Sequence, residues 1–442
     1  MDFEFDLVIK NGTLILKDGE TIADIGVSGK KIKSISKNLQ GHAKEVFDAT
    51  GMHIFPGIID TQVHFREPGL VHKEDLESGS RAAALGGVCT FLEMPNTKPP
   101  TTTIESIKEK VNLAKEKSHV NFGFFIGATG ENLDELKKAH DLEGCCGVKI
   151  FLGSSTGSLL LYDEEKLLEI FKSLQGMIAV HSESEVMLNE RLPIRDNAKD
   201  VHAHYEWRNA ETALSSTKMI VDIAKKAKRK VHVLHITTKE EMQFLKENKE
   251  HVTVEVTPQH LTLNAPDIYD RIGTLAQMNP PIRTQDHQDG LWKGLLDGTV
   301  DVIGSDHAPH TLEEKSNPYP ASPSGMPGVQ TIFPLMLHHH LNGKLDRRRL
   351  VDLLCERPAE LYQLNKGRIE IGRDADFTIV DLSKTTEIKN TEQASKCGWT
   401  PFDGMELKGK VEATIVMGSP VMINGKILPS KSSTPIKKEG SC

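Results

Sequence analysis

Between about residues 53 and 310, short apolar runs alternate with longer amphipathic stretches. Eight apolar runs are rich in Val, Ile, Leu and Phe, as buried parallel strands are: His53–Asp60, Gly87–Met94, Val120–Ala128, Gly147–Leu152, Met177–His181, Val231–Ile236, Val252–Val256 and Val300–Ser305. Apolar residues at three- and four-residue steps predict helices over Thr103–Ser118, Tyr162–Leu174, Asn209–Lys228 and Lys239–Lys249. Eight successive β-α units predict an α/β fold with a closed (β/α)8 barrel of the TIM type.

The two flanks of this region show a different pattern. Residues 5–47 and 373–427 carry short alternating strands, broken by turn-forming pairs such as Asn11-Gly12 and Asn424-Gly425. We expect a small β-sandwich domain built from residues 1–52 and 366–442, beside a barrel of residues 53–365. The final segment, Lys431–Cys442, is rich in Ser, Lys and Pro and is predicted to be disordered.

The bulk composition is ordinary for a globular protein and argues against some classes of binding partner. The chain has 442 residues, a formal net charge of -8 and no apolar stretch long enough to span a bilayer, which argues against nucleic-acid and membrane partners. The acidic start Met1–Asp6 lacks the pattern of a secretory signal, and the six cysteines have neither disulfide-framework nor zinc-motif spacing. We expect a cytoplasmic protein that acts on a small molecule.

Residues able to bind metal stand at the ends of several predicted strands. His64 follows the first, His181 and His235 end the fifth and sixth, and Asp306 follows the eighth. A single histidine after an apolar run is more often structural, but barrels build their active sites at this end of their strands. Imidazoles and a carboxylate that share one cavity are stabilised by a cation, so a metal centre is predicted in the barrel mouth.

Two further groups of histidines are weaker candidates. His202-Ala-His204 follows no apolar strand and is placed in a long surface loop, and His338–His340 lies on a predicted helix. Neither group is expected to bind the metal.

Lys149, inside the fourth predicted strand, needs a separate explanation. An ammonium group in a cation site would be both repelled and desolvated. Reaction with carbon dioxide would turn it into an anionic carbamate, whose two oxygens can bridge two metal ions as a carboxylate does. The alternative is a barrel-interior lysine paired with an acidic residue.

These residues resemble the cyclic-amidohydrolase branch of the amidohydrolase superfamily, and within it the dihydroorotases. The resemblance covers nearly the whole chain and rests on eight segments: Phe55–Asp60, His64–Gly69, Glu93–Thr97, Val233–Ile236, Met278–Arg283, Ser305–His310, Gly325–Gly328 and Asp374–Phe377. The Met-Pro-Asn and Asp-His-Ala-Pro-His stretches are much more specific than the metal ligands alone.

The resemblance implies a role for each matching residue. One or two zinc ions would be held by His64, Lys149 (possible carboxylation included), His181, His235 and Asp306. The substrate's ring carboxylate would be bound by Arg66, Asn96 and His310, with Asn279 and the Pro327-Gly328 backbone beside the ring. Asp306 would accept the proton of water and return it to the leaving nitrogen.

The implied reaction is the reversible cyclisation of N-carbamoyl-L-aspartate to dihydroorotate in pyrimidine biosynthesis, without an organic cofactor, in a homodimer or homotetramer. A guanidinium that grips a carboxylate with two parallel hydrogen bonds suits Arg66, whose alternative is a surface ion pair with Glu67 or Glu74. The loop Leu152–Gly157 lacks the aspartate bridge of variant families, which favours Lys149 as the bridging residue.

One position departs from the family pattern. The first-strand motif is usually His-x-His, and Gln62 stands at its first position. An amide oxygen is a much weaker zinc ligand than an imidazole, so the site shared by His64 and Asp306 should be weakened. A one-metal or unequal two-metal centre is predicted.

Two other functions stay open. A hydantoinase, dihydropyrimidinase or allantoinase would share the barrel and the ligands, but Arg66, Asn96 and His310 argue against a ring without a carboxylate. A catalytically silent barrel that serves as a structural partner of aspartate transcarbamoylase is supported by Gln62, although the other ligands remain.

Overall fold

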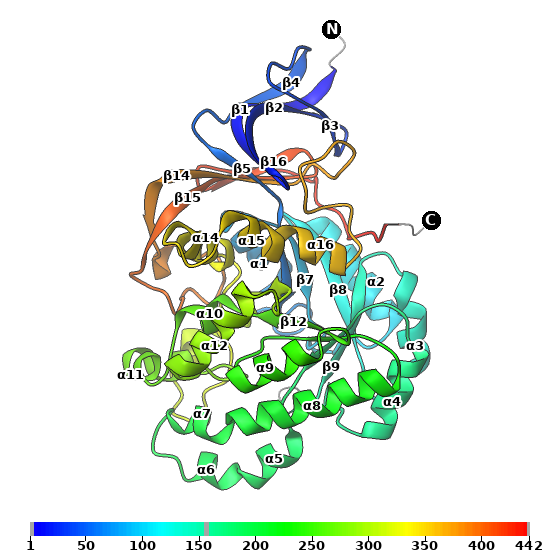
Figure 1. Cartoon of the computed structure of the whole chain (residues 1–442), viewed down its shortest axis with the longest axis vertical. Coiled ribbons are helices and arrows are strands. Elements are labelled where there is room, and N and C mark those ends of the chain that lie inside the picture. Colours follow the sequence, from blue (N-terminus) through cyan, green and yellow to red (C-terminus); the bar gives the residue numbers. More distant parts are fainter. Residues whose placement is uncertain (1–3, 154–158, 440–442) are drawn as a thin grey trace.

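An eight-stranded parallel sheet forms the centre of the larger part of the molecule (Figure 1). The structure is a computed structural model that describes residues 4–153 and 159–439. The strands are hydrogen-bonded in chain order: β6 (Ile58–Val63), β7 (Val88–Glu93), β8 (Asn121–Gly127), β9 (Cys145–Phe151), β10 (Ile178–His181), β11 (Val231–Val233), β12 (Val252–Val256) and β13 (Val302–Ile303). A parallel bridge between Val63 and His307 closes the sheet, so the predicted barrel is confirmed.

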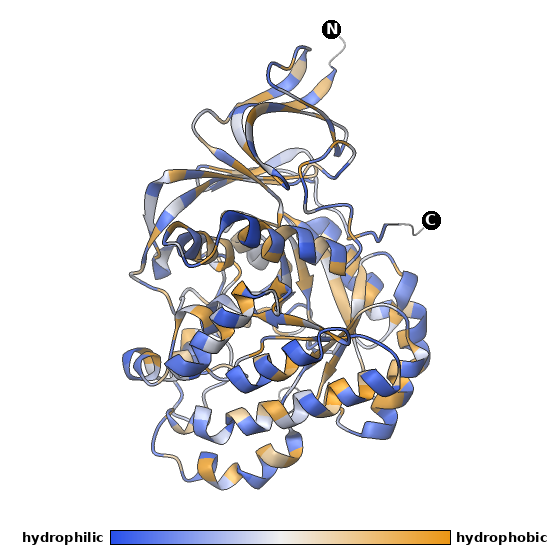
Figure 2. Cartoon of the chain, in the orientation of Figure 1, coloured by the Kyte–Doolittle hydropathy of each residue, from blue (hydrophilic) through white to orange (hydrophobic). Residues whose placement is uncertain are grey.

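Helices surround this barrel and connect its strands (Figure 1). They are α1 (Leu76–Leu85), α2 (Ile104–Lys117), α3 (Leu133–Lys138), α4 (Glu164–Ser173), α5 (Glu185–Glu190), α6 (Leu192–Asp196), α7 (Ala203–Trp207), α8 (Ala210–Lys226), α9 (Lys239–Glu247), α10 (Pro258–Thr262), α11 (Asp267–Ile272), α12 (Gln285–Leu296), α13 (Leu312–Lys315), α14 (Ile332–Leu341), α15 (Arg347–Val351) and α16 (Arg357–Leu361). Hydrophobic and hydrophilic residues alternate around these helices (Figure 2), as amphipathic helices on a barrel require. The helices predicted from periodicity correspond to α2, α4, α8 and α9, with ends within two residues.

A nine-stranded sheet formed by both ends of the chain lies at the top of Figure 1. Its strands are β1 (Phe5–Leu16), β2 (Gly19–Ser28), β3 (Lys31–Ser36), β4 (Ala43–Asp48), β5 (His53–Pro56), β14 (Phe377–Glu387), β15 (Glu406–Val416), β16 (Ser419–Ile423) and β17 (Lys426–Ile427). The N-terminal and C-terminal strands meet where β5 pairs antiparallel with β14. They form one continuous hydrogen-bonded sheet with its own apolar core. The predicted small β structure from both ends of the chain is confirmed, and the domain bounds 1–52 and 366–442 stay a prediction.

The first predicted barrel strand is divided in the structure. Its beginning, β5, belongs to the small sheet, and the barrel begins at Ile58 in β6. Between them, the backbone N–H of Gly57 donates to the carbonyl of Asp376 at 2.8 Å. A Cβ atom at Gly57 would lie 2.6 Å from Cβ of Asp376 and 2.9 Å from Cβ of Cys89. Glycine therefore lets the chain pass closely from one sheet to the other.

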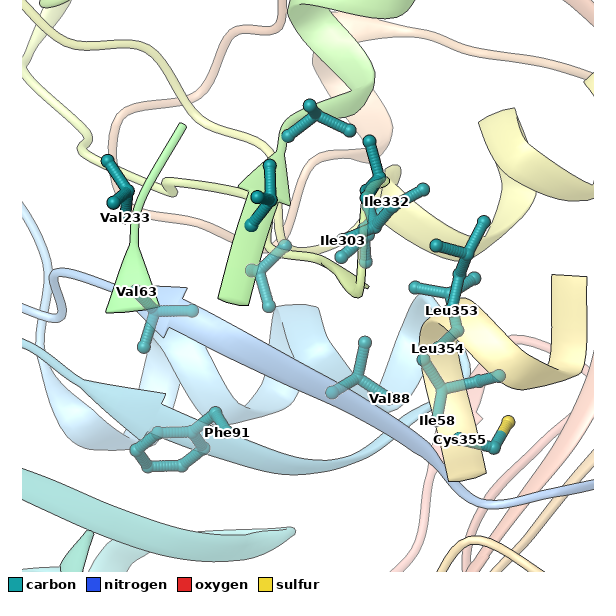
Figure 3. Close-up of a cluster of buried hydrophobic side chains, with 14 of the residues drawn as sticks. Ile58, Val63, Val88, Phe91, Val233, Ile303, Ile332, Leu353, Leu354 and Cys355 are labelled. Atoms are coloured by element: carbon teal, nitrogen blue, oxygen red, sulfur yellow. The ribbon is translucent and has the colours of Figure 1, made fainter. Parts of the chain in front are cut away.

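The barrel wall packs against the helices through a large apolar cluster (Figure 3). Val88 and Phe91 of β7 and Ile303 of β13 are fully buried, as is Ile332 of α14. Burying each such side chain contributes about 1.5–3 kcal/mol, so the wall is a rigid support for residues at the strand ends.

The C-terminal segment is ordered over its described residues, which corrects the prediction of disorder for Lys431–Cys442. Ile436 is buried; its N–H donates to the carbonyl of Phe122 and its carbonyl accepts from Gly144. The segment thus closes over the start of β8, while residues 440–442 lie outside the described part, as do residues 154–158 of the predicted loop after Lys149. Within the described part, no helix is long and apolar enough to cross a membrane.

Candidate active site in the barrel mouth

A cavity of about 330 Å³ opens at the C-terminal ends of the barrel strands. It is lined by Gln62, His64, Arg66, Asn96, Lys149, Phe151, His181, His235, Asn279, Asp306, Ala308, His310, Pro323, Ser324 and Gly325. All five predicted metal ligands and four of the six predicted substrate-binding residues therefore lie around one space, although they come from segments far apart in the sequence.

Pro327 and Gly328 are not among the residues that line this cavity, and their place beside the ring stays a prediction. The N–H of Gly328 instead donates to Nδ1 of His307 at 3.0 Å. The backbone that reaches the cavity lies three residues earlier, at Gly325, whose φ is 137° and where an added Cβ would come within 2.4 Å of the carbonyl oxygen of Ala308. Within the segment Gly325–Gly328, the cavity is lined by its first glycine.

His64 and Asp306 form the first ligand pair. Nδ1 of His64 lies 2.6 Å from the amide oxygen of Asn96, which can only accept, so the proton of the neutral ring is on Nδ1. Its Nε2 lone pair then faces Oδ1 of Asp306 at 3.1 Å. Burial lowers the pKa of His64, which keeps the ring neutral. Two acceptors facing one another in a buried cavity are stabilised by a cation.

His181 and His235 form the second ligand pair. Nε2 of His181 lies 2.7 Å from Oε2 of Glu183, so its proton is held there and its Nδ1 lone pair faces Nε2 of His235 at 3.1 Å. Burial alone would raise the pKa of Glu183, but Arg208, 3.0 Å away, and the bond from His181 hold it at about 2. Glu183 is thus an anion that orients His181, in the manner of the carboxylates behind metal-bound histidines.

Lys149 interacts electrostatically with residues of both pairs. The charge of Asp306 acts on Lys149, and Lys149 in turn acts on His181 and His235. Its Nζ is buried without a hydrogen-bond partner in the described part of the chain, 4.7 Å from the centre of the Phe151 ring. Burial lowers the pKa of Lys149 to about 7. The alternative of an ion-paired interior lysine is not found among the described residues.

The two pairs together fit a metal centre that needs one more anionic ligand. Over residues 4–153 and 159–439, no three His, Cys, Asp or Glu side chains gather closely enough to hold a metal ion by themselves. Each pair needs a further ligand to hold a metal ion. The unpartnered Nζ of Lys149 interacts electrostatically with Asp306 in the first pair and with His235 in the second. A carbamate there would supply oxygen ligands to each pair.

Arg66, His310 and Asn96 form a second polar group on the cavity wall. Arg66 is only 7% exposed, and no carboxylate lies within ion-pair distance of it in the described part of the chain. The alternative of a surface ion pair with Glu67 or Glu74 is therefore wrong. Because the oxygen of Asn96 is held by His64, its Nδ2 group, which can only donate, is left for another acceptor.

His204 is a residue whose position the sequence did not indicate. It was expected on the surface, but it is 1% exposed on α7, and its Nε2 lies 3.0 Å from Oδ1 of Asn279. This contact leaves the Nδ2 group of Asn279 available to a ligand, as in Asn96. His204 and Asn279 are 75 residues apart, so a local pattern contains no signal for the pair. Glu183, in contrast, follows His181 by two residues and a strand-end search could have found it.

Three residues of the site have a positive φ, which side-chain-bearing residues rarely adopt. The angles are 66° at Arg66, 37° at His235 and 45° at Asp306. Such conformations cost about 1–3 kcal/mol each and persist only where the surroundings enforce them. The barrel wall therefore holds these side chains toward the cavity at a cost in backbone energy.

Comparison with known proteins gives a consistent result. The amidohydrolase family matches residues 53–427. A dihydroorotase from Methanosarcina mazei is 36% identical over 416 residues, covering 91% of each chain. A dihydroorotase from Methanothermobacter thermautotrophicus is 34% identical over 434 residues, covering 96% of each chain.

Among solved structures, an L-hydantoinase (dihydropyrimidinase) from Arthrobacter aurescens has a TM-score of 0.92 and 30% identity, and the match covers 98% of this chain and 100% of that one. The solved structure thus shares the fold of nearly the whole chain. The chain belongs to the amidohydrolase family and, within it, to the dihydroorotases.

Proposed function

We propose that this protein catalyses the reversible, metal-dependent cyclisation of N-carbamoyl-L-aspartate to dihydroorotate. The observation that carries the proposal is Arg66, a buried guanidinium without a carboxylate partner in the described part of the chain, in the same cavity as the candidate metal ligands. A buried unpaired charge is costly, so its presence is explained by an anionic ligand. Dihydroorotate carries such a carboxylate on a cyclic amide.

The cavity residues divide into groups that bind and a group that reacts. The guanidinium of Arg66, the amide NH2 of Asn96 and the ring of His310 would hold the carboxylate. The amide NH2 of Asn279 would lie beside the ring, as would the backbone of Ser324 and Gly325, which lines the cavity.

Membership of the amidohydrolase family implies a metal cofactor. We assign zinc to His64, His181, His235, Asp306 and a carboxylated Lys149, with the His181–His235 side the stronger because Gln62 weakens the other. When bound, zinc would supply a Lewis acid that activates water and polarises the ring carbonyl.

Asp306 moves the proton in this proposal. Its carboxylate accepts a proton from the attacking water and delivers it to the leaving ring nitrogen, and the same transfers in reverse accompany ring closure. Its positive φ and the amide of Gln62, which donates to Oδ1, orient this carboxylate, and we assign the proton transfer to Oδ2.

Two other functions compete with this one. The solved hydantoinase favours a ring without a carboxylate, but such a ring would leave Arg66 buried and unpaired. A silent partner of aspartate transcarbamoylase would explain Gln62, but it would not need the two oriented histidine pairs. A homodimer or homotetramer in the cytoplasm is part of our proposal.

The test is a turnover assay of the zinc-loaded protein with dihydroorotate, hydantoin, dihydrouracil and allantoin. Turnover of dihydroorotate alone, lost in Asp306→Ala, is expected. Turnover of hydantoin or dihydrouracil without dihydroorotate would support the hydantoinase alternative. Absence of turnover on all four substrates, with zinc bound, would support the silent partner.

A further inference from the structure

We infer that Lys73 is a positioning residue for carboxylate recognition: it fixes the proton of His310 on Nε2 and thereby leaves Arg66 free to bind the substrate anion. The inference rests on the proposed function for the identity of that anion. Lys73 lies in the loop between β6 and α1, outside the motifs that the sequence singled out.

Lys73 contacts His310 and is not among the residues that line the cavity. Its Nζ lies 3.1 Å from Nδ1 of His310 and 2.9 Å from Oε1 of Glu314. Its side chain is only 14% exposed, so these contacts are largely shielded from water. The backbone carbonyl of His310 is held by Nε1 of Trp399 at 2.8 Å, which fixes the base of the side chain.

Two independent contacts require the same tautomer of His310. An ammonium group has donors and no lone pair, so Nδ1 of His310 must accept from Lys73. Nε2 lies 3.1 Å from the carbonyl oxygen of Ser324, which has only lone pairs, so Nε2 must carry the proton. A neutral imidazole has one donor and one acceptor, and this assignment uses both.

The assignment has a direct consequence for Arg66. Its Nη2 lies 3.3 Å from Nε2 of His310, but a protonated Nε2 cannot accept a hydrogen bond. Arg66 Nε is directed to the carbonyl of Pro309 at 3.3 Å, and no carboxylate pairs with the guanidinium in the described part of the chain. Nη2 of Arg66 is therefore left without an acceptor at this place, and a substrate carboxylate can accept from it.

Removal of the Lys73 ammonium would allow the other tautomer of His310. Nδ1 of His310 lies 3.7 Å from Oε2 of Glu314 and could then donate toward that carboxylate. The proton would leave Nε2, which would then accept from Nη2 of Arg66, and this donor of Arg66 would be lost to an internal contact. Lys73 therefore acts by excluding this arrangement and adds positive charge beside the carboxylate position.

The experiment compares Lys73→Met and Lys73→Arg with wild type and with Lys98→Met, which removes an exposed lysine from a neighbouring loop. For the zinc-loaded enzyme, we expect Lys73→Met to raise KM for dihydroorotate about tenfold or more, with kcat within about threefold. Lys73→Arg keeps the charge and the donors and should restore most of KM, and Lys98→Met should match wild type.

The tautomer is read separately by 15N NMR of labelled histidine, with His310→Gln used to assign the signal. Wild type should show Nδ1 of His310 unprotonated, and Lys73→Met should show a shift of the proton toward Nδ1. A wild-type signal with the proton on Nδ1, or an unchanged KM in a folded Lys73→Met, would overturn the inference.

Binding of orotate, measured by calorimetry, separates this inference from the proposed function. If wild type binds orotate but does not turn over dihydroorotate, the proposed reaction fails while Lys73 can still be tested by orotate affinity. An orotate affinity that is equal in wild type and Lys73→Met would refute the role of Lys73 whatever the reaction is.

Discussion

Replacing Arg66 by Met should make the protein more stable and destroy its activity. Burial lowers the pKa of Arg66 from 12.5 to about 10, despite nearby carboxylates that favour the charge. That difference corresponds to about 3 kcal/mol of unfavourable free energy for the charged form in the folded protein. The variant also loses the hydrogen bond to the carbonyl of Pro309, worth about 1 kcal/mol. We expect a net gain of about 2 kcal/mol in the free energy of unfolding.

The pH dependence of this cost follows from its sign. Below pH 10, Arg66 is charged in both the folded and the unfolded chain, so the cost is fully present at neutral pH. It is relieved only as the pH rises above the folded-state pKa of about 10. Urea unfolding of the zinc-loaded proteins at pH 7.5 therefore measures the whole effect.

Arg208 provides the matched control because it is also buried but is paired with Glu183 at 3.0 Å. Arg208→Met removes a partner from a buried carboxylate and should destabilise the protein by about 3–5 kcal/mol. Arg66→Met should lower kcat/KM for dihydroorotate by more than a thousandfold, because the carboxylate loses its guanidinium. An Arg66→Met protein less stable than wild type by 1 kcal/mol or more, or one that keeps its activity, would refute the reasoning.

Three other predictions concern the metal centre. Gln62→His should raise the zinc content by up to one ion per chain, measured by elemental analysis; an unchanged content would contradict the role given to Gln62. Glu183→Gln should weaken zinc binding about 10–100-fold in chelator competition, because His181 loses its orienting carboxylate. Uptake of 13C-labelled carbon dioxide by Lys149 in the metal-free protein should increase with pH and be half-maximal near its pKa of about 7, since only the free amine reacts.

Most of the fold could be predicted because buried parallel strands leave continuous apolar runs. The exceptions occur where one apolar run contributes strands to two sheets, or where tertiary packing determines whether a segment is ordered. His53–Asp60 is one run, yet β5 and β6 belong to different sheets, and the division at Gly57 depends on the close approach of Asp376. The polar C-terminal segment is held by Ile436 and backbone hydrogen bonds to Phe122, which composition cannot reveal.

The candidate site was predictable to the extent that strand ends converge. That rule brought together His64, Lys149, His181, His235 and Asp306, which line one cavity in the structure. It could not find side chains that reach the site from connecting segments. His204 on α7 contacts Asn279, and Lys73 in the loop before α1 contacts His310. The two partners are far apart in the sequence in each case, and only folding brings them together.

Gln62, which stands where the family motif has its first histidine, contacts the candidate metal ligand Asp306. Its Nε2 group donates to Oδ1 of Asp306 at 3.0 Å, the same oxygen that faces His64. A cation shared by His64 and Asp306 would be repelled by the amide N–H, so the amide would have to turn its oxygen inward first. With a histidine at this position, no such rearrangement would be needed. We therefore predict that the amide orients Asp306 as a base without a metal on that side, and that the two sides of the centre are unequal.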